Sequence, residues 1–306
     1  MPHKPVLLEE VLHYLNPRPG MIVVDGTLGS AGHAAALAGR IQPNGTLIGL
    51  DQDPQAIERA RIVLKDFRHT SIHRENFRHL DKVLDTLNIS NVDAVLLDVG
   101  LSSDQLEEDQ RGFSFEREGP LDMRMDPAAS LTARDIVNDS SQEDLEKLFR
   151  ELADERQARR FARVICETRQ TRPFETTTDL AQTICGIFSA KRNIRGSKKT
   201  WWFRRHPATR VFQALRIAVN DELRALREAL PTIWARIKGG GRLAVITFHS
   251  LEDRIVKYQF RAWKDAHEAV ILTKKPVTPS RQELEDNARA RSAKLRVVEK
   301  IHEGTR

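Results

Sequence analysis

Short apolar runs alternate with amphipathic stretches in the first hundred residues of the chain. Met21–Val24, Leu47–Leu50 and Ala94–Leu97 are apolar runs bounded by polar residues, as buried strands of parallel sheets are. Between them, Ala31–Ala38 and Pro54–Leu64 carry apolar residues at helical spacing. Strands that alternate with helices predict an α/β fold with a doubly wound, Rossmann-like parallel sheet.

The pattern changes in the middle of the chain, where no stretch between Leu106 and His206 has the character of a buried strand. Helices are predicted there over Glu143–Leu152, Arg156–Thr168 and Thr178–Phe188. The sequence therefore predicts an inserted all-helical domain, residues 106–205. The discontinuous sheet domain around it is formed by residues 1–105 and 206–306.

The sheet pattern resumes after the predicted insertion. One long helix is predicted from Ala208 to Leu230, with its apolar residues on one stripe, and a strand at Leu243–Phe248. An alternating segment, Leu295–Val298, is predicted to close the sheet as an antiparallel edge strand.

The first three predicted strands end in the acids Asp25, Asp51 and Asp98. Carboxyl ends of parallel strands meet at one edge of a sheet, where ligands of such folds bind. The turn after Asp25 has a glycine at every third position, 26, 29 and 32, which lets a ligand approach the backbone. An acid at the second strand end suits the hydroxyls of a ribose. A nucleoside-containing cofactor is therefore predicted.

The spacing G-x-x-G-x-x-G departs from the dinucleotide fingerprint G-x-G-x-x-G. A carboxylate at the turn also repels a diphosphate, whereas it attracts the sulfonium and amino groups of S-adenosylmethionine. We therefore expect S-adenosylmethionine, with a dinucleotide or a turn that binds no ligand as the alternatives.

Charge is segregated along the 306-residue chain, whose net charge is +6. Residues 104–155 contain 16 acidic residues against 6 Lys/Arg, and residues 156–210 contain 14 Lys/Arg against 3 acidic residues. Such segregation indicates one surface built for a polyanion. The alternative is that the acidic and basic segments pair with each other.

Neither a signal peptide nor a membrane-spanning run is evident, and the two cysteines, Cys166 and Cys185, have no metal-ligand spacing. We expect a cytoplasmic protein without a metal and without a membrane partner. The oligomeric state stays open, with a homodimer as one alternative.

Several long motifs occur in order along the chain: DGTLGSAGH, LDQDP, LLDVGLSSDQL, RGFSF, GPLDMRM, HPATRVFQALRI, FHSLEDRIVK and ARSAKLRV. Together they resemble the bacterial 16S ribosomal RNA cytosine-N4 methyltransferase family (RsmH, also MraW) over nearly the whole chain. The resemblance implies a class I S-adenosylmethionine-dependent methyltransferase domain with an inserted helical substrate-recognition domain. It also implies methylation of N4 of a decoding-centre cytidine in 16S rRNA, within the small ribosomal subunit.

Carried over from the family, the predicted cofactor contacts are Ala31, Gly32, His33, Asp51, Phe77, Asp98 and Gln105. Two positions depart from the family pattern. Ser30 and Ala31 stand where the family more often has glycine, which could alter the fit around the methionine end of the cofactor. NARARSA stands where members commonly have NPRARSA.

Two side chains are candidates for catalysis. Asp98 is one, because an acceptor at the exocyclic amine would localise its lone pair and take its proton. The Pro-Pro-aromatic that often follows such a residue is absent, so Asp98 could instead bind only the cofactor. His249 is the other, because it follows the strand Leu243–Phe248; a structural histidine is the alternative.

The basic segment supplies the candidates for RNA binding. On the predicted helix Arg156–Thr168 three arginines share one face. Lys191–Arg205 has seven Lys/Arg and no acid, with aromatic residues that could stack on bases or dock the insertion. The predicted RNA contacts are Arg156, Arg160, Arg163, Lys198, Lys199, Trp201, Arg204 and Arg205. A methyltransferase for DNA or a small molecule, or an assembly factor without catalysis, are the competing interpretations.

Overall fold

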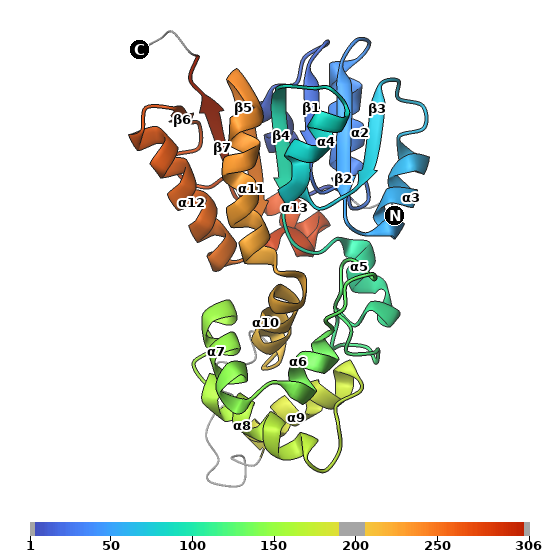
Figure 1. The fold of residues 1–306 in the computed structure, drawn as a ribbon, viewed down its shortest axis with the longest axis vertical. Coiled ribbons are helices and arrows are strands. Elements are labelled where there is room, and N and C mark those ends of the chain that lie inside the picture. The colour runs from blue at the N-terminus through green and yellow to red at the C-terminus, as the bar shows by residue number, and fades with distance from the viewer. Residues whose placement is uncertain (1–3, 190–205, 303–306) are drawn as a thin grey trace. The chain divides into compact units, whose positions relative to one another are not determined.

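The computed structural model describes residues 4–189 and 206–302 and divides the chain into two compact units (Figure 1). Unit 1 consists of Met1–Ser102 and Leu223–Arg306, and unit 2 of Ser103–Glu222. The domain boundaries expected from the sequence were residues 105 and 206. The first boundary lies three residues earlier, and the second lies after Glu222 because helix α10 (Thr209–Asn220) packs on helices of unit 2 rather than on the sheet.

Unit 1 contains one seven-stranded sheet with the order β3-β2-β1-β4-β5-β7-β6. Its strands are β1 (Ile22–Asp25), β2 (Thr46–Asp51), β3 (Thr70–Arg74), β4 (Val92–Asp98), β5 (Ile237–Thr247), β6 (Ala269–Ile271) and β7 (Lys294–Lys300). The first five are parallel, and β7 runs antiparallel to β5 and β6. This order, with one reversed strand near the edge, is that of a class I methyltransferase, as expected.

Helices cover both faces of the sheet, so successive strand residues are buried in different cores. Val23 belongs to the core that contains residues of α1, α2 and α3. Val24 belongs to the core that contains residues of α4, α11 and α12. The helices of unit 1 are α1 (Leu8–Leu15), α2 (Gly32–Ile41), α3 (Pro54–Val63), α4 (Leu80–Thr86), α11 (Glu222–Arg236), α12 (Ser250–Asp265) and α13 (Arg281–Asp286). Burial on both faces explains why the strands are continuous apolar runs.

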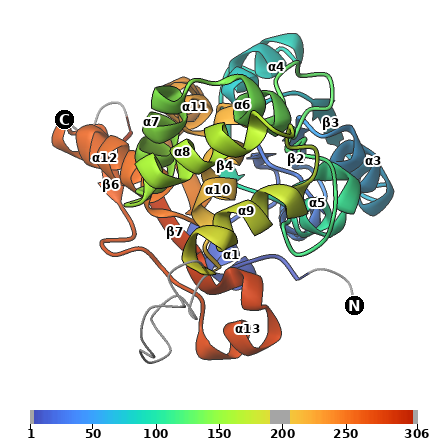
Figure 2. The ribbon, with the colours of Figure 1, turned by 90° about the horizontal axis from the view of Figure 1, so that it is seen from below.

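The start of the described chain is held on unit 1 by α13 and the residue that follows it. The Leu7 amide donates to Glu283 Oε1 of α13 at 2.7 Å, and Asn287 Nδ2 donates to the Lys4 carbonyl at 3.3 Å. Figure 2 shows α13 beside the start of the chain. These bonds fix the segment that precedes α1, which we call the N-terminal strap (residues 4–7).

Unit 2 is helical, as predicted. Its helices are α5 (Ser103–Glu107), α6 (Ala133–Asp139), α7 (Gln142–Ala153), α8 (Ala158–Arg169), α9 (Thr177–Ser189) and α10 (Thr209–Asn220), with a 3-10 turn at Asp109–Arg111. Polar caps begin several of them; Thr132 and Asp135 form a capping box at α6, for example. Phe149 and Phe161, on α7 and α8, are fully buried.

Three predictions were wrong in detail. The helix expected from Ala208 to Leu230 is two helices, because Asp221 adopts a left-handed conformation (φ 51°) between α10 and α11. The strand expected at Leu243–Phe248 begins earlier, at Ile237, and includes the glycines before it. The antiparallel strand β7 lies between β5 and β6, so the edge of the sheet is β6.

No helix in the described part of the chain is long and apolar enough to cross a membrane.

Candidate functional site

The turn after β1 is built so that its backbone lies against β4 and β2. The Gly26 amide donates to the Leu96 carbonyl at 2.9 Å, and the Leu28 amide to the Leu50 carbonyl at 2.9 Å. A Cβ on Gly26 would lie 2.5 Å from Leu97 Cδ2, so a larger residue does not fit there. Ala31 is buried and left-handed, with φ of 59°. The turn is therefore held rigidly at the carboxyl ends of the strands.

Asp51, at the end of β2, is tied to this turn. Its Oδ2 accepts from the Gly29 amide and its Oδ1 from the Asp53 amide, both at 2.9 Å. Burial raises the pKa of Asp51 to about 6, although the two backbone donors oppose the rise. Each oxygen keeps a second lone pair, so the carboxylate can also accept from ligand hydroxyls.

Asp25, at the end of β1, is buried, and few hydrogen bonds replace the water that its carboxyl group has lost. Its Oδ1 accepts from the Thr27 amide at 3.1 Å, and its Oδ2 has no hydrogen-bond partner among residues 4–189 and 206–302. Burial, followed by the negative charge of Asp51, raises the pKa of Asp25 to about 7.

Asp98, at the end of β4, is the most perturbed of the three acids. Its amide donates to Thr27 Oγ1 at 2.7 Å, while its buried Oδ1 accepts no hydrogen bond from any residue that the structure describes. Burial raises the pKa of Asp98 to about 8, and the charges of Asp25 and Glu252 add to the rise. A positive or hydrogen-bond-donating ligand is the natural partner for such a group.

His33 lies between the N-terminal strap and Asp98. Its Nε2 is 2.9 Å from the Val6 carbonyl oxygen, and its Nδ1 is 3.7 Å from Asp98 Oδ2. A carbonyl oxygen only accepts, so Nε2 carries the proton of this bond. Gly32 is needed beside it, because a Cβ there would lie 2.4 Å from Pro5 Cγ. Both ring nitrogens thus face protein atoms, which limits a predicted cofactor contact of His33 to its backbone or ring edge.

The remaining predicted cofactor contacts lie in different units. Phe77 begins a 3-10 turn (Phe77–His79) after β3. It lies at the same strand ends as Gly26, because a Cβ built on Gly26 would be 3.3 Å from Phe77 Cβ. Gln105 is buried in α5 of unit 2, and its contact with a cofactor stays a prediction.

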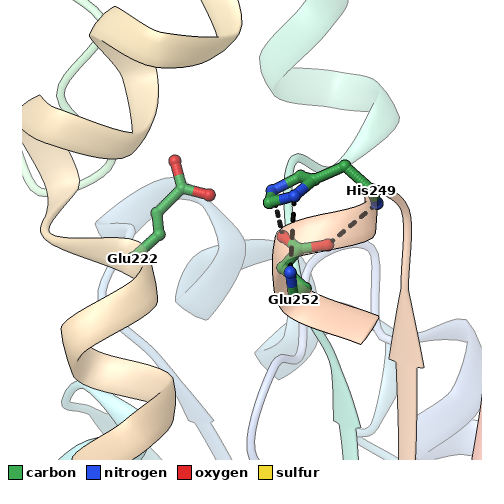
Figure 3. A group of neighbouring side chains, drawn as sticks. All are labelled: Glu222, His249 and Glu252. Atoms are coloured by element: carbon green, nitrogen blue, oxygen red, sulfur yellow. Dashed lines mark hydrogen bonds and ion pairs between the residues drawn. The ribbon is translucent and has the colours of Figure 1, made fainter. Parts of the chain in front are cut away.

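His249 caps helix α12, which supports the structural alternative for this residue (Figure 3). Glu252 Oε2 accepts from the amides of Phe248 and His249 at 2.8 and 3.2 Å, and the Glu252 amide donates to His249 Nδ1 at 3.5 Å. The other ring nitrogen, Nε2, is 2.9 Å from Glu252 Oε1. Glu222, also drawn, forms a bidentate pair with Arg216 in unit 2. The Nε2 of His249 is buried and accepts or donates no hydrogen bond among the described residues, so a catalytic role for His249 stays a prediction.

The predicted RNA contacts are only partly described. Arg156 precedes α8 in a turn, so the three arginines do not share one helix, contrary to the expectation. Arg160 donates to the Ile187 carbonyl at 2.6 Å, and exposed Arg163 lies 3.6 Å from Glu167. The other predicted contacts, Lys198, Lys199, Trp201, Arg204 and Arg205, lie outside the described residues.

Sequence reasoning missed two participants in the site. The Thr27 hydroxyl accepts from the Asp98 amide. Thr27 is part of the motif DGTLG, but it was not predicted as a site residue because it has no titratable group. The Val6 carbonyl that holds His33 is a backbone group 27 residues away in sequence, and no side-chain pattern signals it.

Comparison with known proteins agrees with the motifs. The profile of the MraW methylase family matches residues 1–301. The chain is 45% identical over 317 residues to the ribosomal RNA small subunit methyltransferase H of Heliobacterium mobile, covering 98% of this chain and 99% of that protein. The protein of the same name from Geobacter sulfurreducens is 46% identical over 316 residues, with 98% and 99% covered. The one from Caldicellulosiruptor bescii is 44% identical over 314 residues, again with 98% and 99% covered. With strand order, motifs and full-length similarity in agreement, the chain belongs to the MraW methylase family.

Proposed function

We propose that this protein methylates the exocyclic N4 amine of a cytidine in small-subunit (16S) ribosomal RNA, with S-adenosylmethionine as the methyl donor. The observation that carries the proposal is the set of buried carboxylates at the ends of β1, β2 and β4. Two of them, Asp25 and Asp98, leave an oxygen without a hydrogen bond from any described residue. The target class comes from relatives of about 45% identity, which are named as methyltransferases of small-subunit ribosomal RNA.

The residues at these strand ends suit that donor. When bound, it supplies a methyl group on a positively charged sulfur. Asp51 would accept from the hydroxyls of its ribose through lone pairs that the Gly29 and Asp53 amides leave available. Asp25 and Asp98, whose raised pKa values of about 7 and 8 leave them partly protonated near neutral pH, would supply negative charge when a cation binds beside them. A pyrophosphate would add charge of the wrong sign here, which argues against a dinucleotide.

The chemistry requires little more from the protein than positioning. An amine in line with the S–CH3 bond needs no metal, and holding the two reactants in that geometry supplies much of the acceleration. The nitrogen of a cytosine amine is a weak nucleophile, because its lone pair is delocalised into the ring. A carboxylate that accepts from this amine counters the delocalisation, and Asp98 at the end of β4, whose side chain is 23% exposed, is the candidate for that carboxylate.

The basic surface of unit 2 would bind the RNA. Arg156 and Arg163 are exposed there, and seven Lys/Arg follow in residues 191–205. Phosphate contacts of this kind give affinity with a strong dependence on salt. A small-molecule methyltransferase would have no use for such an insertion.

The experiment is methyl transfer from a labelled donor to three substrates: small ribosomal subunits, naked 16S rRNA and naked DNA. Nucleosides from the labelled product are then identified by mass spectrometry. We expect N4-methylcytidine in the RNA or the subunit. Label on another atom of cytidine would refute the N4 assignment, and label on DNA alone would refute the RNA substrate. Wild-type transfer by Asp98→Asn, with exposed Asp66→Asn as the matched control, would remove Asp98 from the site.

A further inference from the structure

His33 and Asp98 form a described pair at the strand ends that could hold a proton between them. The His33 ring is buried, and its Nδ1 faces Asp98 Oδ2 at 3.7 Å. The distance is about 1 Å longer than a hydrogen bond, so the pair is apposed rather than bonded. In many active sites such a contact tightens only when the reactants are bound.

The N-terminal strap decides which nitrogen of His33 faces the acid. Because Nε2 donates to the Val6 carbonyl at 2.9 Å, the neutral ring presents the bare Nδ1 lone pair to Asp98. The strap cannot shift freely, since Pro5 packs against Gly32 and Leu7 bonds to Glu283 of α13. The tautomer of His33 is therefore fixed by backbone that belongs to neither α2 nor β4.

From this geometry we propose that Asp98 and His33 form the acceptor for the proton that the cytidine amine must lose, with Val6 as the positioning group. The inference rests on the proposed function. After methylation the N4 nitrogen carries a positive charge and a surplus proton. One N4–H bond breaks with its electron pair left on nitrogen, and an O–H bond forms on Asp98 Oδ2, the oxygen that faces His33. The His33 Nδ1 lone pair then accepts a hydrogen bond from that new hydroxyl.

The charges around Asp98 favour this direction of transfer. The titratable groups that face it are Asp25 on β1, Glu252 on α12 and His33 on α2. The two acids raise its affinity for a proton, and a bound cation lowers it again. The donor is a cation before methyl transfer and neutral afterwards. Asp98 is thus ionised while the donor is bound and becomes a better base when the amine proton has to leave.

A matched pair of variants separates proton transfer from structure. His33→Gln places an amide N–H near the position of Nε2, so it keeps the bond to Val6 but removes the titratable Nδ1. His33→Asn places a polar atom near Nδ1 and loses the bond to Val6. If His33 only held the strap in place, the Gln variant would act as wild type and the Asn variant would fail.

We expect the opposite for His33→Gln. Its thermal midpoint stays near wild type because the bond to Val6 is kept, and its rate is compared with wild type at saturating S-adenosylmethionine. Its single-turnover methyl transfer falls about 10- to 100-fold, as loss of a general base does, and the midpoint of its pH–rate profile moves to lower pH. The midpoint moves that way because protonated Asp98 has lost its hydrogen-bond acceptor.

A readout without any substrate completes the test. In the cofactor-free protein, ¹⁵N NMR of histidine-labelled samples is expected to show His33 protonated at Nε2 and bare at Nδ1. The tautomer with the proton at Nδ1, or a His33→Gln variant with the wild-type rate and pH profile, would overturn the proposal. Absence of methyl transfer by the wild type to any RNA would instead refute the proposed function, and the NMR result would stand apart from it.

Discussion

Replacing Asp98 by asparagine should stabilise the cofactor-free protein while it destroys the site. Asp98 has a pKa of about 8 in the folded protein against 3.8 for the free side chain. The folded state therefore binds a proton that the unfolded chain has lost, and stability falls as the pH rises from about 4 to 8. The whole shift corresponds to about 6 kcal/mol at 1.36 kcal/mol per unit. Side-chain relaxation and entry of water reduce that cost, so we expect a gain of about 2 kcal/mol or more for Asp98→Asn at about pH 9.

Thermal unfolding without cofactor measures the effect. At about 2 °C per kcal/mol for a protein of this size, the midpoint of Asp98→Asn should rise by about 4 °C or more near pH 9. Near pH 5 the difference should be much smaller, roughly a third of its full size, because the gain builds up only as the pH rises from about 4, where the unfolded side chain ionises, to about 8. Exposed Asp66→Asn is the control and should match wild type at both pH values. Calorimetry should show that Asp98→Asn has lost most of its affinity for S-adenosylmethionine.

The opposite result has a clear meaning. A variant that is less stable than wild type near pH 9 would show that the Asp98 charge is compensated in the cofactor-free protein. The same gain at both pH values would indicate better packing rather than removal of a buried charge. Either outcome would refute the view that the buried carboxyl group of Asp98 lowers the stability of the cofactor-free protein and is retained because it binds a cationic ligand.

Three further outcomes follow from residues described above. Gly32→Ala should lose about 1–3 kcal/mol of stability by urea unfolding, because its Cβ would lie 2.4 Å from Pro5 Cγ; an unchanged midpoint would mean that the strap yields easily. His249→Asn should keep methyl transfer within a few-fold, because asparagine also caps helices, whereas a loss above about 100-fold would restore His249 as a catalytic residue. Reversing the charges of Lys198 and Lys199, which lie outside the described residues, should weaken RNA binding and lower its salt slope by about 1–2; an unchanged slope would place the phosphates elsewhere.

The strand ends were predictable from sequence because their signal is local. An apolar run followed by an acid and a glycine turn occupies few residues, and parallel strands bring such ends together. Asp25, Asp51 and Asp98 accordingly meet at one edge, as expected. Their unpaired oxygens and raised pKa values depend on burial by other segments, which no local pattern reports.

The errors have the same origin in non-local structure. Helical spacing continues across Asp221, and only the left-handed backbone there separates α10 from α11. An aspartate carries no strong stop signal of the kind that glycine gives. Arg156 was assigned to a helix for its spacing, yet Glu155 Oε1 accepts from the Gln157 amide and the helix begins at Ala158. The place of β7 within the sheet depends on its pairing with β5, some 50 residues earlier in the chain.

The bond between Leu7 and Glu283 joins groups 276 residues apart and has a consequence for synthesis. A nascent chain can assemble β1 to β4 early, but the anchor for the N-terminal strap emerges from the ribosome 276 residues after Leu7. Until then, Val6 has no fixed position from which to hold His33. Competence to bind the methyl donor should therefore arise only after α13 has been synthesised, and truncated chains that lack α13 should fail to acquire it.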